Sequence, residues 1–484
     1  MPETPKGLSL FSGVKKPTRL LSGVTVVAVM AKPYPCPHGR CLYCPGGPEA
    51  GTPQSYVKTS PAVARALHVG YDPYAQVRLR IKQYIAMGHE PSKVELIVMG
   101  GTFPAMPRDY QEWFVAQALE ALNRFPGDPE GSISLDEAMK RNETAGIRCV
   151  GLTLETRPDW SMEEHVDWFL HLGATRIELG VQTIYDDVLA RVNRGHGVKE
   201  SIKATRILKD AGYKVTYHMM LGLPGSDPDR DFEAFKEIYT SEEFMPDSVK
   251  IYPTLVIPGS GLYNLWKRGE YKPYDMDTLV ELIARIKSIT PPWVRIIRVQ
   301  RDVPLQEVAD GPPVNNLREI VWDYMRNKGL KCRCIRCREV GRFALWTGVK
   351  PSISEAKLTR RRYEANGGFE EFISFESSDQ EVLFGFLRLR IPSEQAHRWE
   401  VDSNTAFIRE LHVYGPETPV GRESEWWQHL GLGRRLIREA ETIARDYYGA
   451  RKMLVISAVG TREYYRKLGY EVLPGSFYMY KPLE

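Results

Sequence analysis

Strand-like and helix-like segments alternate from residue 24 to residue 256, and this alternation constrains the fold more than any other feature of the chain. Parallel strands need crossovers of a dozen or more residues, and the helical patterns at 109–125 and 161–173 have that length. The candidate strands are residues 24–30, 93–101, 148–157, 176–182, 214–223 and 248–256. We therefore predict an α/β fold that begins with a partial, TIM-like (β/α)6 barrel.

Small and polar residues follow these strands at their carboxyl ends, where barrel enzymes carry their active sites. A loop with Cys36, Cys41 and Cys44, here called the first triad, comes after the first strand. Gly100, Gly101 and Thr102 end the second strand, Glu155 ends the third, and Gln182 and Lys250 lie on or near the fourth and sixth. These six residues and the first triad are here called the strand-end candidates. The pattern predicts that all of them converge on one mouth of the barrel. For Lys250, a salt bridge at that mouth is an equally good interpretation.

The cellular setting decides how the seven cysteines are interpreted. A length of 484 residues predicts two or three domains, and no apolar run is long enough to span a bilayer. The N-terminal residues lack the apolar core and cleavage pattern of a secretory signal, so we expect a cytoplasmic protein without a membrane partner. In a reducing compartment, closely spaced thiols hold metal more often than they form disulfides.

The cysteines form two groups of three and one single residue. The first triad has the spacing C-x4-C-x2-C, which either leaves a metal position open for chemistry or suits a structural zinc with a fourth ligand from elsewhere. Cys332, Cys334 and Cys337, the second triad, are closer together, and we favour a structural zinc site over free thiols. Cys149 lies in an apolar run and is interpreted as a buried small hydrophobe.

The last third of the chain has a different pattern, with antiparallel-looking strands followed by a long amphipathic helix. The candidate strands are residues 358–377, 381–392, 405–415 and 452–460. Gln428, Gly431 and Gly433 form a Q-x-x-G-x-G turn at the start of the helix. Such a turn presents backbone N–H groups that suit a pyrophosphate, although a plain helix cap would have the same glycines.

Motifs in a fixed order carry a family resemblance. The three-cysteine loop and the GG turn after the second strand resemble the radical S-adenosylmethionine superfamily, although the common spacing there is C-x3-C-x2-C. The ELHVYG strand, the Q-x-x-G-x-G turn and YYRKLGY are similar to GCN5-related acetyltransferases. Together, MAKPYPCPHGRCLYCPGG, VMGGTF, LETRPD, ELGVQT, KIYPTLVIPG, CREVG, RELHVYG and VGTREYYRKLGY resemble the family of the catalytic third protein of Elongator, in its archaeal or bacterial form.

The resemblance implies four segments and a reaction. The segments are a basic N-terminal segment (1–20), a radical SAM domain (21–290), a basic, Cys-rich zinc linker (291–345) and a GNAT-like acetyltransferase domain (346–484). The reaction is modification of the wobble uridine of tRNA to 5-carboxymethyluridine from acetyl-CoA and S-adenosylmethionine. In it, an adenosyl radical takes hydrogen from the acetyl methyl group, and the resulting carbon radical adds to carbon 5 of uracil.

The resemblance also implies residue roles. The first triad would hold a 4Fe-4S cluster, and the other strand-end candidates would bind S-adenosylmethionine. The residues implied for acetyl-CoA are Lys93, Glu410, Leu411, His412, Val413, Gln428, Gly431, Leu432, Gly433, Arg434 and Tyr465. Three residues are candidates for catalysis. Tyr465 would act near the thioester, Tyr464 is a second candidate but is expected in the core, and Lys250 is the third. From composition alone, Lys93 is an ordinary solvated lysine.

A tRNA substrate needs a basic surface, and a net charge of +4 is too small to show one. Basic runs at 15–19, 293–301, 331–338 and 357–362 favour a groove between the domains for the anticodon stem-loop. Any single run is more often a solvated face. The reaction also needs an electron donor.

The sequence is compatible with a homodimer. Nothing in it indicates obligate Elongator subunits.

Two other functions stay open at this point. A protein lysine acetyltransferase with a structural Fe-S cluster would need an acidic base near the thioester and would not require S-adenosylmethionine. A non-enzymatic tRNA-binding scaffold would tolerate degenerate sites. The intact first triad and the intact Q-x-x-G-x-G turn argue against the scaffold, and the complete set of barrel-mouth motifs argues against the lysine acetyltransferase.

Overall fold

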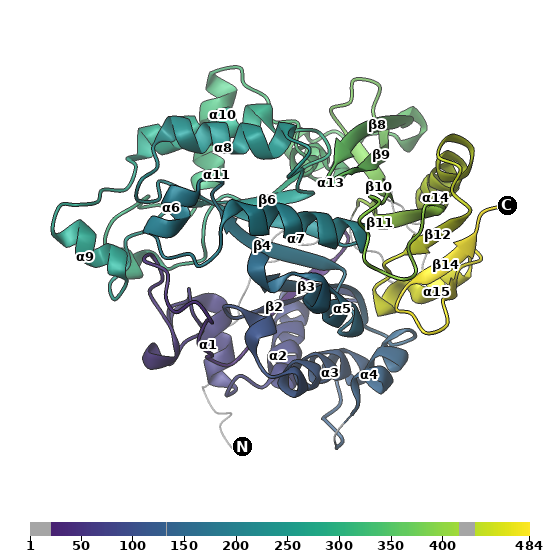
Figure 1. The fold of residues 1–484 in the computed structure, drawn as a ribbon, viewed down its shortest axis with the longest axis horizontal. Coiled ribbons are helices and arrows are strands. Elements are labelled where there is room, and N and C mark those ends of the chain that lie inside the picture. The colour runs from purple at the N-terminus through teal and green to yellow at the C-terminus, as the bar shows by residue number, and fades with distance from the viewer. Residues whose placement is uncertain (1–20, 132, 416–430) are drawn as a thin grey trace, which may run out of the picture.

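The computed structural model describes residues 21–131, 133–415 and 431–484, which form two seven-stranded sheets. Figure 1 shows the first sheet in purple to teal and the second in green to yellow. The predicted fold class is confirmed, because a parallel half-barrel precedes a separate mixed sheet. In the part of the chain that the structure describes, no helix is long and apolar enough to cross a membrane.

The first sheet is parallel throughout, and its strands are neighbours in chain order. They are β1 (Thr25–Met30), β2 (Lys93–Met99), β3 (Arg148–Thr156), β4 (Arg176–Gln182), β5 (Lys214–Leu221), β6 (Ser248–Pro253) and β7 (Arg295–Arg298). The accompanying helices are α1 (Pro61–His68), α2 (Pro73–Ala86), α3 (Arg108–Arg124), α4 (Leu135–Asn142), α5 (Glu163–His171), α6 (Asp186–Arg191), α7 (Val198–Asp210), α8 (Pro228–Thr240), α9 (Gly261–Lys267) and α10 (Met276–Ile289).

The seventh strand corrects the predicted number of six. β7 pairs in parallel with β6, for example through Ile296 with Val249. The sequence analysis placed this segment in the basic linker, because a four-residue strand that begins and ends with arginine hides its apolar period. After β7 the chain forms three further helices, α11 (Leu317–Asn327), α12 (Ile335–Arg338) and α13 (Val340–Thr347).

The second sheet is mixed, in the order β13-β14-β12-β11-β10-β9-β8. Its strands are β8 (Lys357–Ala365), β9 (Gly368–Glu376), β10 (Leu383–Ile391), β11 (Thr405–Val413), β12 (Lys452–Val455), β13 (Glu471–Val472) and β14 (Met479–Pro482). Two helices pack with it: α14 (Leu432–Thr442), which continues in a π-helical turn, and the short α15 (Arg462–Arg466).

Several crossover helices begin where the sequence supplies a cap. Asp227 accepts hydrogen bonds from the backbone N–H groups of Asp229 and Arg230, and Pro228 occupies the first position of α8. A proline at that position loses no helical hydrogen bond, and an aspartate cap satisfies donors that would otherwise be unpaired. Asp275 caps α10 in the same way. These caps fix where the chain turns back over the sheet.

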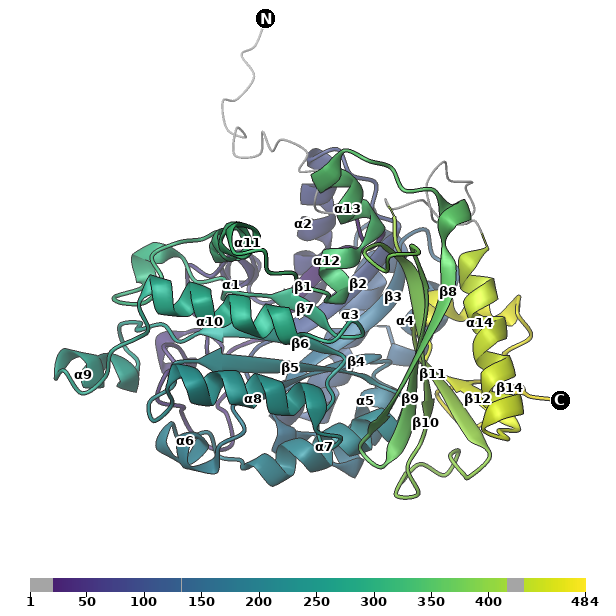
Figure 2. The ribbon, with the colours of Figure 1, turned by 90° about the horizontal axis from the view of Figure 1, so that it is seen from above.

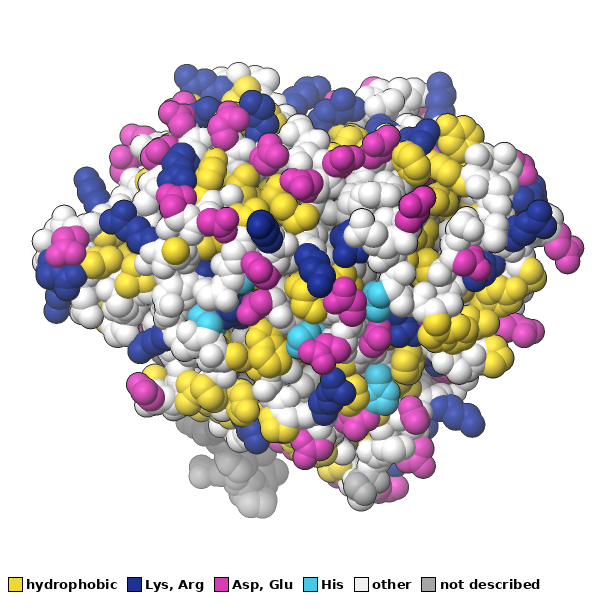
Figure 3. Space-filling view, viewed as in Figure 1, with side chains coloured by type: hydrophobic (Ala, Val, Ile, Leu, Met, Phe, Trp, Pro, Cys, Tyr) yellow, Lys and Arg dark blue, Asp and Glu magenta, His cyan; other side chains and the backbone are white. Residues whose placement is uncertain are grey.

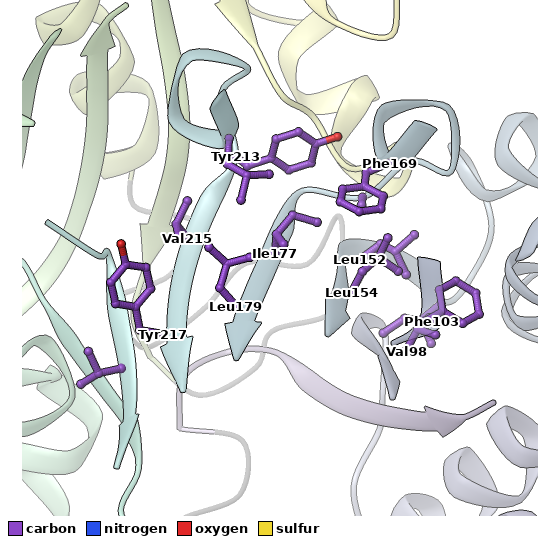
Figure 4. Packing of buried hydrophobic residues seen from close by; sticks show 14 of the residues in the cluster. Val98, Phe103, Leu152, Leu154, Phe169, Ile177, Leu179, Tyr213, Val215 and Tyr217 are labelled. Carbon is purple, nitrogen blue, oxygen red and sulfur yellow. The ribbon is translucent and has the colours of Figure 1, made fainter. Parts of the chain in front are cut away.

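Alternate residues of the parallel strands divide between the hydrophobic core and the barrel interior. Leu154 and Ile177, which are paired in register, belong to the large core shown in Figure 4. The next pair in register, Glu155 and Glu178, therefore faces the interior of the half-barrel. Apolar packing holds the sheet on its outer face, and the inner face is left for polar chemistry.

The second sheet packs against the end of the half-barrel where the parallel strands begin. Asp247 directly precedes β6, and its carboxylate accepts hydrogen bonds from Arg409 of β11 at 2.7 and 2.8 Å. Asp210, at the end of α7, accepts from Arg390 of β10 at 2.6 and 3.0 Å. Figures 1 and 2 both show the second sheet at this end. The carboxyl ends of the parallel strands lie at the opposite end.

Candidate active site

A cavity of about 410 Å³ lies at the carboxyl ends of the parallel strands. The strand-end candidates that line it are Cys36, Cys41, Cys44, Gly101, Thr102, Glu155, Gln182 and Lys250. The remaining candidate, Gly100, directly precedes the lining residue Gly101 in the sequence. The cavity also runs along the inner face of the edge strand β1, where Val26 and Ala28 line it. The structure therefore brings together residues that the sequence analysis selected one by one.

The two cysteine triads differ in the spacing of their sulfur atoms. In the second triad, the three Sγ atoms lie within 4.8 Å of one another. Such a group suits a single ion, because tetrahedral zinc with Zn–S bonds of about 2.3 Å holds its sulfurs roughly 3.8 Å apart. Among the described residues, the first triad does not form so compact a group. Its wider spacing suits a cluster of several iron atoms and argues against a single structural zinc.

Hydrogen-bond donors from outside the cysteine loop point at the thiols of the first triad. Thr102 Oγ1 donates to Cys36 Sγ at 3.3 Å. The backbone N–H of Ser55 donates to Cys44 Sγ at 2.9 Å. Burial raises the pKa of the Cys36 thiol, and metal ligation requires the thiolate form. Donors aimed at the sulfurs fit ligands that carry negative charge.

The glycine turn after β2 is shaped by its closeness to the cysteine loop. Gly100 and Gly101 have φ values of 135° and 75°, which favour glycine. A Cβ at Gly101 would lie 3.6 Å from Cys36 Sγ, and one at Gly100 would lie 3.1 Å from the Cβ of Ala31. The turn therefore exposes backbone beside the cysteines, where a ligand on the cluster could approach it closely.

Lys250 lies between two carboxylates on the inner face of the half-barrel. Its Nζ contacts Glu178 and lies 3.3 Å from Oε1 of Glu155. Burial by itself would lower the pKa of Lys250, but the charge of Glu178 raises it above its ordinary value. The salt-bridge interpretation of Lys250 is confirmed, and the residue lines the cavity as well.

Two further polar side chains complete this cluster. His218 Nε2 lies 2.8 Å from Oε2 of Glu178, and the Tyr56 hydroxyl donates to Glu155 at 2.9 Å. Burial lowers the pKa of His218, and the charge of Lys250 lowers it further. The sequence analysis missed Glu178 and His218. One sequence signal could have identified them: each is an ionisable residue within an otherwise apolar strand-like run, 176–182 for Glu178 and 214–223 for His218.

Gln182 stands at the end of β4 with an unusual backbone. Its φ of 74° lies in the left-handed region, which residues other than glycine adopt at a cost of order 1–3 kcal/mol. Its side-chain oxygen is buried and has no hydrogen-bond partner among the described residues. A buried acceptor without a partner is costly. Gln182 therefore offers an acceptor to a ligand in the cavity that it lines.

Two supports of the cysteine loop gave no signal in the sequence. The Gln54 side-chain oxygen accepts from the backbone N–H of Cys36 at 2.7 Å, and its amide donates to the Gly39 carbonyl at 3.2 Å. On another side, the segment 192–196 borders the loop, and the Leu42 N–H donates to the carbonyl of Val192 at 3.0 Å. Both contacts join parts of the chain that no local pattern connects.

The tyrosine pair of α15 corrects the expected arrangement. Tyr465 is 6% exposed and packs in the core of the second sheet, while Tyr464 is 39% exposed. A Cβ at Gly433 would lie 2.7 Å from the Tyr464 hydroxyl, so this tyrosine covers the start of α14. Burial raises the pKa of Tyr464 to about 12. Adjacent helical residues point to different faces, and the core residue is Tyr465, whereas Tyr464 was expected there. Which of the two acts near the thioester stays a prediction.

The other residues implied for acetyl-CoA lie on three elements. Gly431, with φ of 80°, caps α14, and Leu432, Gly433 and Arg434 form its first turn. Gln428 lies outside the described residues. Lys93 begins β2.

On β11, the ladder with β12 ends at Ile408, and the strand continues to Val413 through Glu410, Leu411 and His412. Glu410 accepts a hydrogen bond from Arg388 of β10 at 2.9 Å, and His412 donates to the carbonyl of Ser22 at 2.7 Å.

The second triad lies between β7 and α13, away from the cavity lining. The buried Lys287 of α10 lies 3.8 Å from Cys337 Sγ. Among the described residues, no fourth His, Cys, Asp or Glu joins the three thiols. Cys334 immediately precedes α12, and the next residue, Ile335, donates its N–H to the carbonyl of Val294. The triad therefore sits where the end of the first sheet meets the following helices.

Arginines of the predicted basic runs form ion pairs within the protein. Arg295 pairs with Glu339, and Arg338 and Arg361 both pair with Glu376. Figure 3 shows positive and negative side chains interspersed on the face that it presents. The N-terminal basic run lies outside the described residues. Three of the four runs thus contribute less free positive charge than their composition indicates.

Comparisons with known proteins agree with this geometry. The model of the Radical SAM superfamily matches residues 33–237, that of the Radical SAM C-terminal domain matches 246–327, and that of the acetyltransferase (GNAT) family matches 344–470. Elongator complex protein 3 of Mus musculus is 46% identical over 466 residues, covering 94% of this chain and 84% of that protein. The chain belongs to the Elongator complex protein 3 family.

The archaeal relatives share a higher identity with this chain. The protein named tRNA uridine(34) acetyltransferase from Methanocaldococcus jannaschii is 51% identical over 475 residues, covering 97% of this chain and 86% of that protein. The solved structure of Methanocaldococcus infernus Elp3 with an N-terminal deletion has a TM-score of 0.84 and 48% identity, covering 96% of this chain and all of that chain. The predicted resemblance is thereby confirmed.

Proposed function

We propose that the chain is a tRNA-modifying enzyme that converts the wobble uridine to 5-carboxymethyluridine, using acetyl-CoA and S-adenosylmethionine. Relatives named tRNA uridine(34) acetyltransferase support the substrate and the enzyme class. The matched radical SAM and acetyltransferase families support the two cofactors and a 4Fe-4S cluster. The expected partners are the anticodon stem-loop and an electron donor.

One observation carries this proposal: the cavity that holds the first triad also extends along β1, which the residues before it link to the second sheet. Cys41 lines it at the carboxyl ends of the strands, and Val26 lines it near the start of β1. Just before β1, the carbonyl of Ser22 accepts the hydrogen bond from His412 of β11. The strand implied for acetyl-CoA is thus bonded to the residues that lead into β1, and β1 lines the cavity of the first triad, which supports a path for a shared acetyl group.

The residues around the first triad fit a cluster and its ligand. Three thiols leave one iron of a 4Fe-4S cluster open, and when bound this group supplies the electron that cleaves S-adenosylmethionine to an adenosyl radical. The backbone at Gly101 would bind the methionine end. The carboxylate of Glu155 and the side-chain oxygen of Gln182 would accept hydrogen bonds from the ligand, while Lys250 fixes the position of Glu155.

Acetyl-CoA would bind across the second sheet. The first turn of α14, at which Gly431 provides no side-chain cap, would present backbone N–H groups and the positive end of a helix dipole to the pyrophosphate. The part of β11 beyond the β12 ladder would pair with the amides of the pantetheine arm. Tyr464, whose hydroxyl covers Gly433, is the tyrosine placed to contact this ligand.

Arginines at the cavity support an anionic substrate. Arg65, Arg80 and Arg301 line it, and within the described residues none of them forms an ion pair with Asp or Glu. Unpaired guanidinium groups at a pocket that also contains tyrosines suit the phosphates and bases of a single-stranded RNA loop. The second triad would hold a structural zinc ion that stabilises the junction between the two sheets.

The test is anaerobic turnover with analysis of the RNA. The protein is reconstituted with iron and sulfide and mixed with S-adenosylmethionine, acetyl-CoA, a reductant and tRNA, and the digested nucleosides are examined by mass spectrometry. We expect 5-carboxymethyluridine with wild-type protein and with Cys149→Ala, a control at the buried cysteine outside both triads, but not with Cys41→Ala. Unmodified uridine despite cleavage of S-adenosylmethionine would contradict the proposed substrate and favour the lysine acetyltransferase.

A further inference from the structure

The segment Val192–His196 forms a wall along the cysteine loop. The carbonyl of Val192 accepts from the loop backbone, and the side chain of Asn193 donates to the carbonyl of Arg40 at 2.9 Å. A Cβ at Gly195 would lie 2.5 Å from the Cβ of His38, so only glycine allows this approach. The residue in the middle of this wall, Arg194, is 7% exposed.

Arg194 joins the end of β4 to one thiol of the first triad. Its Nε and Nη2 donate to the carbonyl of Gly180 at 3.1 and 2.6 Å, and its Nη1 donates to Cys41 Sγ at 3.7 Å. Gly180 makes this possible, because a Cβ there would lie 2.3 Å from Nη2. Two separate sequence motifs, ELGVQT and NRGH, are thus fitted to one another around a guanidinium that faces a sulfur.

No carboxylate neutralises this guanidinium at contact distance. Among the described residues, no Asp or Glu lies within 4.0 Å of Arg194. The neighbouring Arg157 is different, since Asp159 accepts hydrogen bonds from its Nε and Nη2 at 2.9 and 2.7 Å. A buried charge without a partner is unfavourable. Arg194 therefore needs negative charge from what the cysteines hold.

We propose that Arg194 raises the reduction potential of the cluster held by the first triad. The cluster would then accept more easily the electron that starts the reaction. Reduction adds one negative charge to the cluster, and a nearby buried cation stabilises the reduced form more than the oxidised form. A hydrogen bond to a ligating sulfur acts in the same direction. This inference rests on the proposed cluster and concerns a residue that positions charge, not one that contacts the substrate.

The experiment is a redox titration of the reconstituted full-length protein, followed by electron paramagnetic resonance, with iron and sulfide content measured in parallel. In Arg194→Met, which keeps an unbranched flexible side chain but removes the charge and the donor, we expect the midpoint potential to move to a more negative value. Arg194→Lys keeps the charge and should show a smaller shift. Arg191→Met, an equal charge change at the exposed end of α6, should titrate like the wild type.

A second variant covers the case in which Arg194→Met loses its iron. Gly180→Ala keeps the arginine but displaces its guanidinium from the Gly180 carbonyl, so the midpoint potential should differ from that of the wild type. Midpoints equal to wild type in the iron-loaded Arg194 and Gly180 variants would overturn the role of Arg194 and leave the proposed function intact. A wild-type protein that binds no cluster would overturn both.

Discussion

Asp247 and Arg409 form a buried two-point ion pair that joins the two sheets, with distances of 2.7 and 2.8 Å. The charge of Arg409 outweighs the effect of burial and holds the pKa of Asp247 well below its usual range. In Arg409→Met, the carboxylate is left buried without its main partner. We expect a loss of about 3–5 kcal/mol in the free energy of unfolding, measured by denaturant titration.

The matched control is an exposed pair. Asp323 and Arg326 on α11 are 65% and 71% exposed in their side chains, and exposed pairs contribute little. Arg326→Met should leave the denaturant midpoint unchanged. Equal midpoints for Arg409→Met and Arg326→Met would show that the buried pair does not hold the sheets together.

Gln54 is expected to be needed for iron loading. Gln54→Met keeps the approximate size of the side chain but removes the acceptor for the Cys36 N–H, and an unpaired buried donor costs about 1–3 kcal/mol. The loop should hold its cysteines less well. We expect less iron and sulfide per chain after reconstitution, measured by chemical analysis and visible absorbance.

Gln76 provides the control, because it makes the same kind of contact far from the cysteines. Its side chain accepts from the Met30 N–H at 2.8 Å and donates to the Met30 carbonyl at 3.0 Å. Gln76→Met should lower the thermal stability but leave iron loading at the wild-type level. If both variants lost iron equally, Gln54 would have only a general structural role.

The residues that the sequence could predict are those whose place follows from period and topology. Glu155 lies at the carboxyl end of β3 and Gln182 at that of β4, and parallel strands end at one face, so their meeting at the cavity needed no knowledge of side-chain contacts. Gln54 and Arg194 act through contacts between segments distant in sequence, and nothing local marks them. In a five-residue helix such as α15, the face that turns toward the core depends on the core it packs against. The sequence alone therefore could not decide which of the two tyrosines is buried.

The two tyrosines of α15 should give opposite results. Tyr465→Ala empties a place in the core beside Tyr470 and should lower the free energy of unfolding by about 3–5 kcal/mol. Tyr464→Ala should change stability little but weaken acetyl-CoA binding, because its hydroxyl covers Gly433. Thermal unfolding and calorimetric titration with acetyl-CoA separate the two effects. Weaker acetyl-CoA binding in Tyr465→Phe, with unchanged binding in Tyr464→Ala, would show that Tyr465 is the tyrosine that contacts the ligand.

His218 should make the folded protein sensitive to mild acid. Burial and the charge of Lys250 lower its pKa in the folded state, whereas in the unfolded chain it protonates near 6.5. Below about pH 6.5 the unfolded state therefore binds a proton that the folded state does not, and stability falls as pH falls, by at most about 1.4 kcal/mol per pH unit.

The measurement for His218 is the free energy of unfolding at pH 7 and at pH 5. His218→Gln should lose less stability over this interval than the wild type. His68→Gln, at an exposed position on α1, should lose as much as the wild type. A wild-type slope in His218→Gln would show that the ring is protonated in the folded state, held between Glu178 and its other neighbours.

The second triad is expected to bind one zinc ion independently of the iron cluster. Its three thiols lie within 4.8 Å of one another, and the adjacent α12 begins at the residue after Cys334. Cys334→Ser should remove zinc, measured by elemental analysis, and lower the unfolding temperature, because the ion joins the start of α12 to the residues before it. Cys149→Ser, at a buried cysteine that donates only to the Gly151 carbonyl, should keep its zinc. Wild-type protein purified without zinc, and unchanged in stability when zinc is added, would show that the triad consists of free thiols beside Lys287.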